Sequence, residues 1–194
     1  MRAIRRTIST AALFAALCLP ASGETLGLSP ADPQPDAAAL TQGLAVSYAY
    51  PPEVGSLQQA KDWLDDARPG PPLSGLRYID TAKGEVALTS RQETRVVAEI
   101  SGYVRFERAG AHKIEFYSND GLLVEIGGRE VSRYDGRHPC ESGGYQDVTV
   151  PEPGWYEIKA LYFQRLGTSC LLMKWDADSG KPGWAADEAF AYLK

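Results

Sequence analysis

Histidine, cysteine and methionine are scarce in this chain, which has two histidines, three cysteines and two methionines in 194 residues. A zinc site needs three or four closely spaced ligands, whereas Cys140 and Cys170 lie far apart with one histidine, His138, near them. A nucleophilic triad needs a base and an orienting group as well as its nucleophile. Ser142 is near His138, but no nucleophile elbow surrounds it. Zinc binding and nucleophilic catalysis are therefore not expected.

Paired carboxylates, the other common route to hydrolysis, are no better supported. Glycoside hydrolysis requires two carboxylates that flank a cleft. Asp135 and Glu141 are neighbours in sequence, and such proximity alone does not indicate a cleft. We expect no enzymatic activity.

Long apolar runs are also missing. No segment approaches the roughly 20 apolar residues that a membrane-spanning helix needs. The start of the chain carries Arg2, Arg5 and Arg6, then the short apolar run 11–19 and the small residues of 20–23. This order is typical of a secretory signal peptide over residues 1–23, although a lipid anchor at Cys18 and a twin-arginine signal are weaker alternatives. We expect a periplasmic or secreted protein that does not span a membrane.

Basic clusters are absent as well. The chain has 20 Lys and Arg against 25 Asp and Glu, a formal charge of −5. Loss of residues 1–23 would remove three arginines and no acids, giving −5 − 3 = −8. A nucleic-acid-binding protein collects Lys and Arg on one face to neutralise phosphates, so no nucleic-acid partner is expected.

The cysteine count has a second meaning if the signal peptide is cleaved. Cys18 would leave with it, and Cys140 and Cys170 would remain in an oxidising compartment. Two cysteines there favour one disulfide bond, which would stabilise the fold by about 3 to 4 kcal/mol. Two buried free thiols are the alternative.

Residues 24–42 contain Pro30, Pro33, Pro35 and a run of alanines without helical or strand periodicity. This composition predicts a flexible spacer. A single folded domain is then expected over 43–194, beginning with a strand over 44–50, whose composition suits a strand.

One short helix is predicted early in that domain. Ser56 and Gln59 have the spacing of a capping box. Four apolar residues follow at helical spacing, namely Leu57, Ala60, Leu64 and Ala67. Pro69 and the residues after it end the run.

From Arg95 onward the apolar period is two, which predicts half-buried strands. The first such strand places five apolar residues on one face: Val96, Ala98, Ile100, Val104 and Phe106. Turn signals with glycine separate the later strands, at 109–110, 127–128 and 153–154. The sequence therefore predicts a mainly β protein, an antiparallel β-sandwich with one short helix inserted near its N-terminus.

The order of motifs resembles the protective-antigen 14-kDa domain, a β-sandwich module of secreted toxins, glycosidases and flocculin-type adhesins. The motifs that carry the resemblance, over roughly 43–176, are Gly102-Tyr-Val-Arg-Phe106, Ala109-Gly110, Ser118-Asn-Asp-Gly121, Val124-Glu-Ile-Gly-Gly128, Pro153-Gly-Trp-Tyr156, Leu161-Tyr-Phe163 and Leu171-Leu-Met-Lys-Trp175.

The resemblance implies a ligand site at Asn119-Asp120. Carbohydrate-binding members of that family carry an Asp-Asp pair there, which holds a calcium ion. In this chain Asn119 replaces the first acid, so fewer charges face a cation that takes six to eight oxygen ligands. The candidate calcium ligands are Asn119, Asp120 and Asp135. The alternative is a purely conformational role, because Asn, Asp and Gly are favoured in tight turns.

A long loop is expected over 132–146, and long loops on rigid sandwiches often carry binding. It supplies the remaining candidate ligand-binding residues, Tyr134, Asp135, Arg137 and Tyr145. Aromatic rings cover the apolar face of a pyranose while charged groups bond its hydroxyls. The alternative is a solvated loop whose tyrosines lean on the core.

Two functions remain after this survey. The first is an exported, non-catalytic carbohydrate-binding module, with or without calcium, whose partner is a glycan or cell-surface polysaccharide. The second is a structural or protein-interaction module of the cell envelope that has neither a metal nor a glycan ligand and whose protein partner is unknown.

Overall fold

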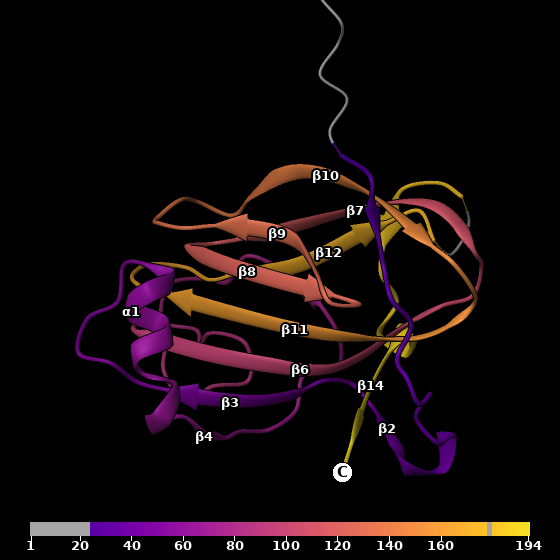
Figure 1. Ribbon diagram of the computed structural model, residues 1–194. Helices are drawn as coiled ribbons and strands as arrows, with labels where there is room; N and C mark the ends of the chain where they lie inside the picture. The colour runs from indigo at the N-terminus through magenta and orange to yellow at the C-terminus, as the bar shows by residue number, and fades with distance from the viewer. Residues whose placement is uncertain (1–23, 178–179) are drawn as a thin grey trace, which may run out of the picture.

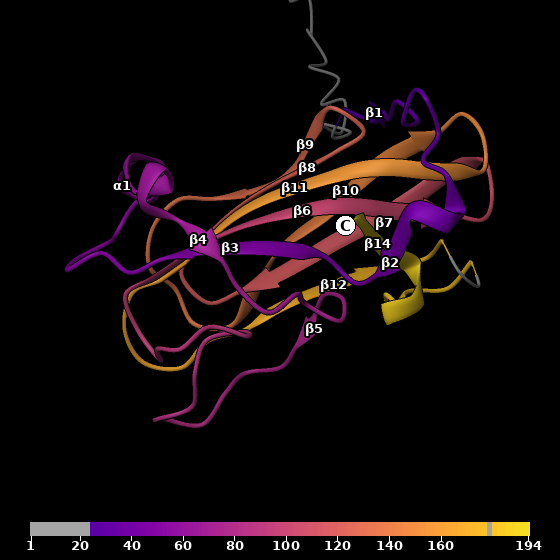
Figure 2. The same cartoon turned by 90° about the horizontal axis from the view of Figure 1, so that it is seen from below.

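Two β-sheets stacked face to face form the body of the protein (Figures 1 and 2). The computed structural model describes residues 24–177 and 180–194, and the predicted signal peptide over 1–23 lies outside them. All strand pairs are antiparallel except β1 with β10, within the described residues. The predicted antiparallel sandwich is confirmed. No helix in those two ranges has the length and apolar character that crossing a membrane requires.

The first sheet, called sheet A, has six strands. In spatial order they are β1 (Leu26–Gly27), β10 (Glu141–Val150), β7 (Gly110–Ser118), β12 (Leu171–Trp175) and β13 (Gly183–Trp184), with β5 (Arg77–Tyr78) also paired to β12.

The second sheet, called sheet B, has eight strands. Their order is β2 (Leu40–Gln42), β14 (Phe190–Leu193), β6 (Val96–Phe106), β11 (Gly154–Gln164), β8 (Gly121–Ile126) and β9 (Arg129–Tyr134), while β3 (Ala45–Ala49) joins β6 and β4 (Arg68–Pro69) joins β3. Three short 3₁₀ turns complete the elements: η1 (Ala37–Ala39), η2 (Leu64–Asp66) and η3 (Asp187–Ala189).

The main core lies between the sheets and contains the apolar face predicted for β6. All five of its residues are buried in that core: Val96, Ala98, Ile100, Val104 and Phe106. The Phe106 ring lies edge-on to Tyr156, with centroids 5.1 Å apart, and 5.2 Å from the Trp175 ring. Each such fully buried side chain adds about 1.5 to 3 kcal/mol through apolar burial. The period-two pattern therefore located the correct face.

Helix α1 (Leu57–Asp62) is shorter than the predicted run, because Trp63 leaves helical geometry and η2 follows. Ser56 Oγ accepts a hydrogen bond from the Gln59 amide at 3.2 Å, as expected of an N-cap. Leu57 packs in a second apolar cluster on the outer face of sheet B, which also contains Phe163. The helix thus sits at one end of the sandwich (Figure 1).

The segment expected as a flexible spacer, 24–42, is instead part of both sheets. β1 pairs with β10, and β2 pairs with β14. The Leu28 amide donates to Thr149 O at 2.9 Å, and its side chain is buried in the core. Backbone pairing of two- and three-residue strands leaves no periodicity for a sequence pattern to detect.

The loop expected over 132–146 is also shorter than predicted. β9 continues to Tyr134 and β10 begins at Glu141, so the connection is 135–140. Gly143 and Gly144 belong to an irregularity inside β10, where the register shifts between Ser142 and Tyr145. Glycine is common both in bulges and in loops, so the sequence pattern does not distinguish the two.

Candidate functional site

Three loops meet at the end of the sandwich that carries α1 (Figure 1): the β7–β8 turn at 119–120, the β9–β10 loop at 135–140 and the β11–β12 loop at 165–170. A disulfide bond joins Cys140 to Cys170, with Cα atoms 5.9 Å apart. The predicted pairing of these cysteines is therefore confirmed. By closing 30 residues, the bond restricts the unfolded chain and holds two of the three loops together.

Asp120 fastens the turn to both neighbouring loops. Its side chain is 1% exposed and its φ is +61°. Oδ2 accepts a hydrogen bond from the Arg165 amide at 2.6 Å, and its own amide donates to His138 O at 3.2 Å. Burial raises the pKa of the Asp120 carboxyl, against the opposing effects of backbone hydrogen bonds and of electrostatic interactions with His138 and Arg137. Asp120 thus links the β7–β8 turn to both neighbouring loops through buried hydrogen bonds.

Asn119 offers an acceptor that the protein does not use. The residue is 8% exposed, and its amide donates to Cys170 O at 3.2 Å. Its side-chain Oδ1 is buried and has no hydrogen-bond partner among the described residues. Leaving a buried acceptor unpaired costs about 1 to 3 kcal/mol, a cost that a donor on a ligand would remove.

A cavity of about 450 Å³ opens between the three loops. Its lining residues are Asn119, Asp120, Arg137, His138, Pro139, Leu166, Gly167 and Thr168. The lining combines one carboxylate with a guanidinium, an amide, an imidazole and a hydroxyl. Such a mixed set can both donate to and accept from a polyhydroxylated ligand.

His138 is a cavity residue that the sequence did not single out as a ligand. It is 8% exposed, with Nε2 3.4 Å from Ser118 Oγ and Nδ1 3.7 Å from Glu141 Oε1. Its ring lies against Tyr134, with centroids 3.5 Å apart. Tyr134 therefore contacts a residue of the cavity lining but is not part of that lining itself. The one feature of the sequence that could have identified His138 as a cavity residue is its position near Cys140, within the loop that is predicted to bind a ligand.

Asp135 is placed elsewhere. Its Oδ1 accepts a hydrogen bond from the Leu57 amide at 2.7 Å, at the N-terminus of α1. Tyr145 also lies away from the cavity lining, in β10 opposite Glu115 of β7, where it is 44% exposed. The structure thus brings Asn119, Asp120 and Arg137 together and separates Asp135 and Tyr145 from them.

The residues present do not fit a calcium ion. Such an ion takes six to eight oxygen ligands, usually with several carboxylates. At the cavity one oxygen of Asp120 already accepts from a backbone amide, Asp135 is committed to α1, and Arg137 brings a positive charge. Within 24–177 and 180–194, no group of three or more His, Cys, Asp or Glu residues is arranged to hold a metal.

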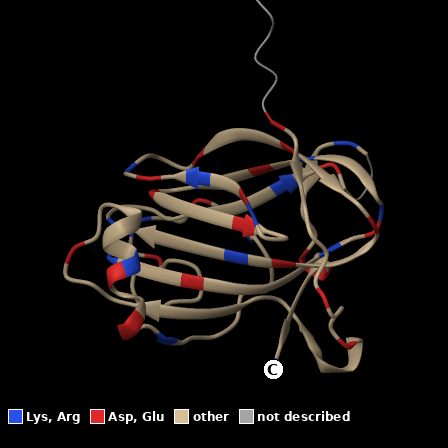
Figure 3. Ribbon diagram, in the orientation of Figure 1, with Lys and Arg blue, Asp and Glu red and all other residues tan. Residues whose placement is uncertain are grey.

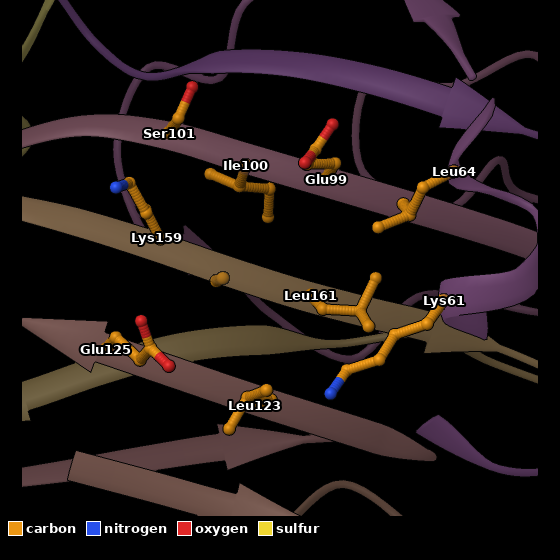
Figure 4. Close-up of a pocket in the computed structure, with 10 residues that line it drawn as sticks. Lys61, Leu64, Glu99, Ile100, Ser101, Leu123, Glu125, Lys159 and Leu161 are labelled. Carbon is orange, nitrogen blue, oxygen red and sulfur yellow. The ribbon is translucent and has the colours of Figure 1, made fainter. Parts of the chain in front are cut away.

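A second hollow, of about 530 Å³, lies on the outer face of sheet B beside α1 (Figure 4). Leu123 and Leu161 form part of its floor, and Leu64 closes the α1 side. Charged side chains of both signs surround this apolar strip: Lys61, Glu99, Glu125 and Lys159. We call this hollow the sheet B groove.

The fold matches solved PA14 domains, PA14 being the protective-antigen 14-kDa module. The PA14 domain of an antifreeze protein gives a TM-score of 0.67 at 16% identity, over 84% of this chain and 96% of that one. A PA14 sugar-binding domain from an RTX adhesin gives 0.58 at 15% identity, over 78% and 99%.

The epithelial adhesin 9 A domain of Candida glabrata, solved in complex with Galβ1-3GlcNAc, gives a TM-score of 0.66 at 13% identity, over 88% of this chain and 97% of that one. No family model and no curated protein matches the chain. At these identities the comparisons establish the fold, which is the one that the order of motifs predicted.

Proposed function

We propose that this PA14-like chain is an exported, non-catalytic carbohydrate-binding module that binds its glycan at the three-loop cavity without calcium. The observation that carries the proposal is the cavity itself, where Arg137 and the unpaired Asn119 Oδ1 lie beside the buried Asp120. Two of the structural neighbours are described as sugar-binding or were solved with a disaccharide.

The chemistry of the cavity suits sugar hydroxyls. The Arg137 guanidinium donates to hydroxyl oxygens, and Asn119 Oδ1 accepts from a hydroxyl hydrogen. Leu166 and Pro139 supply apolar surface for the C–H face of a ring. In place of a metal, Arg137 supplies a positive charge to the cavity lining.

A binding role suits this cavity better than catalysis does. Glycoside hydrolysis uses two carboxylates across a cleft, whereas Asp120 is the one carboxylate among the residues that line the cavity. Asp120 is 1% exposed and its Oδ2 accepts the Arg165 amide. Export is supported by the disulfide, since such bonds persist in oxidising compartments.

Arg137→Ala is the variant that tests this proposal. A soluble chain of residues 24–194 is screened on a glycan array with chelator present, and the best glycan is then titrated by calorimetry. Loss of hydrogen bonds to a charged donor removes about 1.5 to 3 kcal/mol, so affinity should fall roughly tenfold or more. Arg129→Ala, an exposed site on β9 of the same protein, is the control and should bind as wild type does.

The proposal fails if the wild-type chain binds no glycan on the array. It also fails if Arg137→Ala and Arg129→Ala bind equally well.

The sheet B groove favours a protein-interaction module as the second candidate function. Its apolar strip between charges of both signs suits an extended peptide segment (Figure 4). A photo-reactive residue placed at Glu125 would then cross-link one protein in the native envelope, and the same residue at Arg129 would not. Absence of a position-specific adduct would remove this candidate.

A further inference from the structure

A row of four side chains crosses the outer face of sheet A. Tyr145 of β10 is the register partner of Glu115 of β7, Glu115 is also paired with Lys174 of β12, and Lys174 is paired with Trp184 of β13. Residues of one row in adjacent strands share a face. Because Ile114 and its alternating neighbours face the core, the Glu115 row faces outward.

The irregularity in β10 shapes this row. Gly143 and Gly144 are displaced from the register between Ser142 and Tyr145, and the Gly144 amide donates to Ser142 Oγ at 2.8 Å. Ser142 Oγ in turn donates to Glu115 Oε1 at 2.5 Å. An added Cβ at Gly143 or Gly144 would meet nothing within 4 Å, so the surface is open at this point. The bulge thus turns Ser142 toward the carboxylate.

Glu115 is a buried acid on an outward face. It is 6% exposed, its second oxygen Oε2 has no well-formed hydrogen bond among the described residues, and its carboxylate interacts with the Tyr117 hydroxyl. Unpaired buried carboxylate oxygens are costly. A hydrogen bond to Tyr145 and, to a smaller extent, the charge of Glu115 raise the pKa of Lys174. The face therefore has an unused acceptor beside a lysine side chain.

Aromatic rings flank that acceptor on both sides. Tyr145 is 44% exposed and Trp184 is 41% exposed. The Tyr117 ring meets Trp184 edge-on with centroids 5.4 Å apart, and Lys174 Nζ lies 5.9 Å from the Trp184 ring. Three interstrand spacings separate the ends of the row, a span of about 14 Å. This span matches a short oligosaccharide better than a single sugar.

We propose that this surface, formed by Glu115, Tyr117, Ser142, Tyr145, Lys174 and Trp184, is a second binding site, which takes a neutral oligosaccharide or polysaccharide. Trp184 stacks on one sugar ring, a hydroxyl donates to Glu115 Oε2, and Lys174 donates to a neighbouring hydroxyl. Glu115 and Lys174 bring one acidic and one basic group to the row, which favours a neutral ligand over an anionic or a cationic one. None of these residues lines the three-loop cavity, so the inference goes beyond the proposed function and stands apart from it.

Affinity gel electrophoresis of the 24–194 chain tests this site. The gels contain hydroxyethyl cellulose, xyloglucan, galactomannan, mannan or dextran, with polygalacturonate as the anionic comparison. Wild type should be retarded by at least one neutral polymer, and Trp184→Ala should weaken binding about tenfold. Glu115→Gln should weaken it as well, since it replaces the charged acceptor by an amide.

Trp155→Ala is the matched control, because Trp155 is a half-buried tryptophan on sheet B with Arg105 5.7 Å from its ring. It should migrate as wild type does. Thermal unfolding confirms that each variant is folded, and Tyr145→Ala replaces Trp184→Ala if that variant is not. Arg137→Ala should leave retardation by the neutral polymer unchanged, which separates this site from the cavity.

The inference is overturned if no neutral polymer retards wild type, if polygalacturonate alone does so, or if folded Trp184→Ala binds as tightly as Trp155→Ala. Loss of binding in Arg137→Ala with none in Trp184→Ala would sink the second site and leave the proposed function standing. Binding that is kept in Arg137→Ala and lost in Trp184→Ala is the result expected of the second site, and the cavity is then judged by its own glycan titration.

Discussion

Asp120 shows how a carboxylate in the lining of the three-loop cavity can have a structural role. It occupies a left-handed backbone position, which Asp tolerates better than most residues. Its Oδ2 accepts the Arg165 amide, and its backbone binds the loop that carries Arg137. Asp120 thus has the conformational role given as the alternative for Asn119-Asp120, while the ligand role stays a prediction that rests on the unused acceptor of Asn119.

The pH dependence of the melting temperature of Asp120→Asn tests how much the buried charge of Asp120 destabilises the fold. Burial raises the pKa of Asp120 in the folded protein above its unfolded value, so in that window the folded state binds more protons. The stability that wild type derives from this group is full below the unfolded pKa and is lost as pH rises through the folded pKa. Asn stays neutral throughout. The melting temperature of Asp120→Asn relative to wild type should therefore increase from acid to neutral pH, and a difference that is constant with pH would contradict this.

Asp135 shows, also at the residue scale, why the three predicted calcium ligands do not line one cavity. Its partner, the Leu57 amide, is 78 residues away in sequence, and no local pattern records such a contact. Arg137, two residues later, does line the cavity. In a loop of six residues, alternate side chains can face different neighbours, and sequence proximity cannot show which one faces the ligand.

At the scale of elements, α1 depends on the loop that packs against its N-terminus. The first amides of a helix lack internal partners, and Asp135 supplies one acceptor while Ser56 supplies another. Asp135→Ala should therefore destabilise the protein by about 1 kcal/mol in urea unfolding and leave glycan affinity unchanged. Asp65→Ala, an exposed acid in η2, is the control and should cost less than about 0.5 kcal/mol. Loss of glycan binding in Asp135→Ala would instead show that Asp135 takes part in binding.

The disulfide links two of the three loops that form the cavity. Replacing Cys140 and Cys170 by alanine should lower the free energy of unfolding by about 3 to 4 kcal/mol, since 30 residues are released from closure. Reduction of wild type should give the same shift in the urea midpoint. If reduction leaves that midpoint unchanged, the bond does not constrain the unfolded chain as described.

Elements with strong periodicity were predictable, and short or irregular ones were not. The buried face of β6 and the Gly127-Gly128 turn, where both residues have positive φ, follow directly from sequence. β1 and β2 have two and three residues, too few for any period. The sequence predicts a loop where β10 has a bulge, because glycine is common in both features.

At the scale of the whole molecule, the two proposed binding sites lie on separate surfaces of the sandwich. The loops at the α1 end form the mixed polar cavity, and the outer face of sheet A carries exposed aromatics around a buried acid. Residues of both charge signs are interspersed along the ribbon (Figure 3). Two sites on one small module would raise avidity for a polymeric glycan without any change in the affinity of either site.

Calorimetric titration of the array-selected glycan into wild type and Arg137→Ala, each with chelator and then with added calcium, tests the central claim most directly. Calcium-independent binding through Arg137 predicts equal wild-type affinity in both buffers and a loss of about tenfold or more in the variant. Binding that appears on calcium addition, or that survives intact in Arg137→Ala, would contradict it.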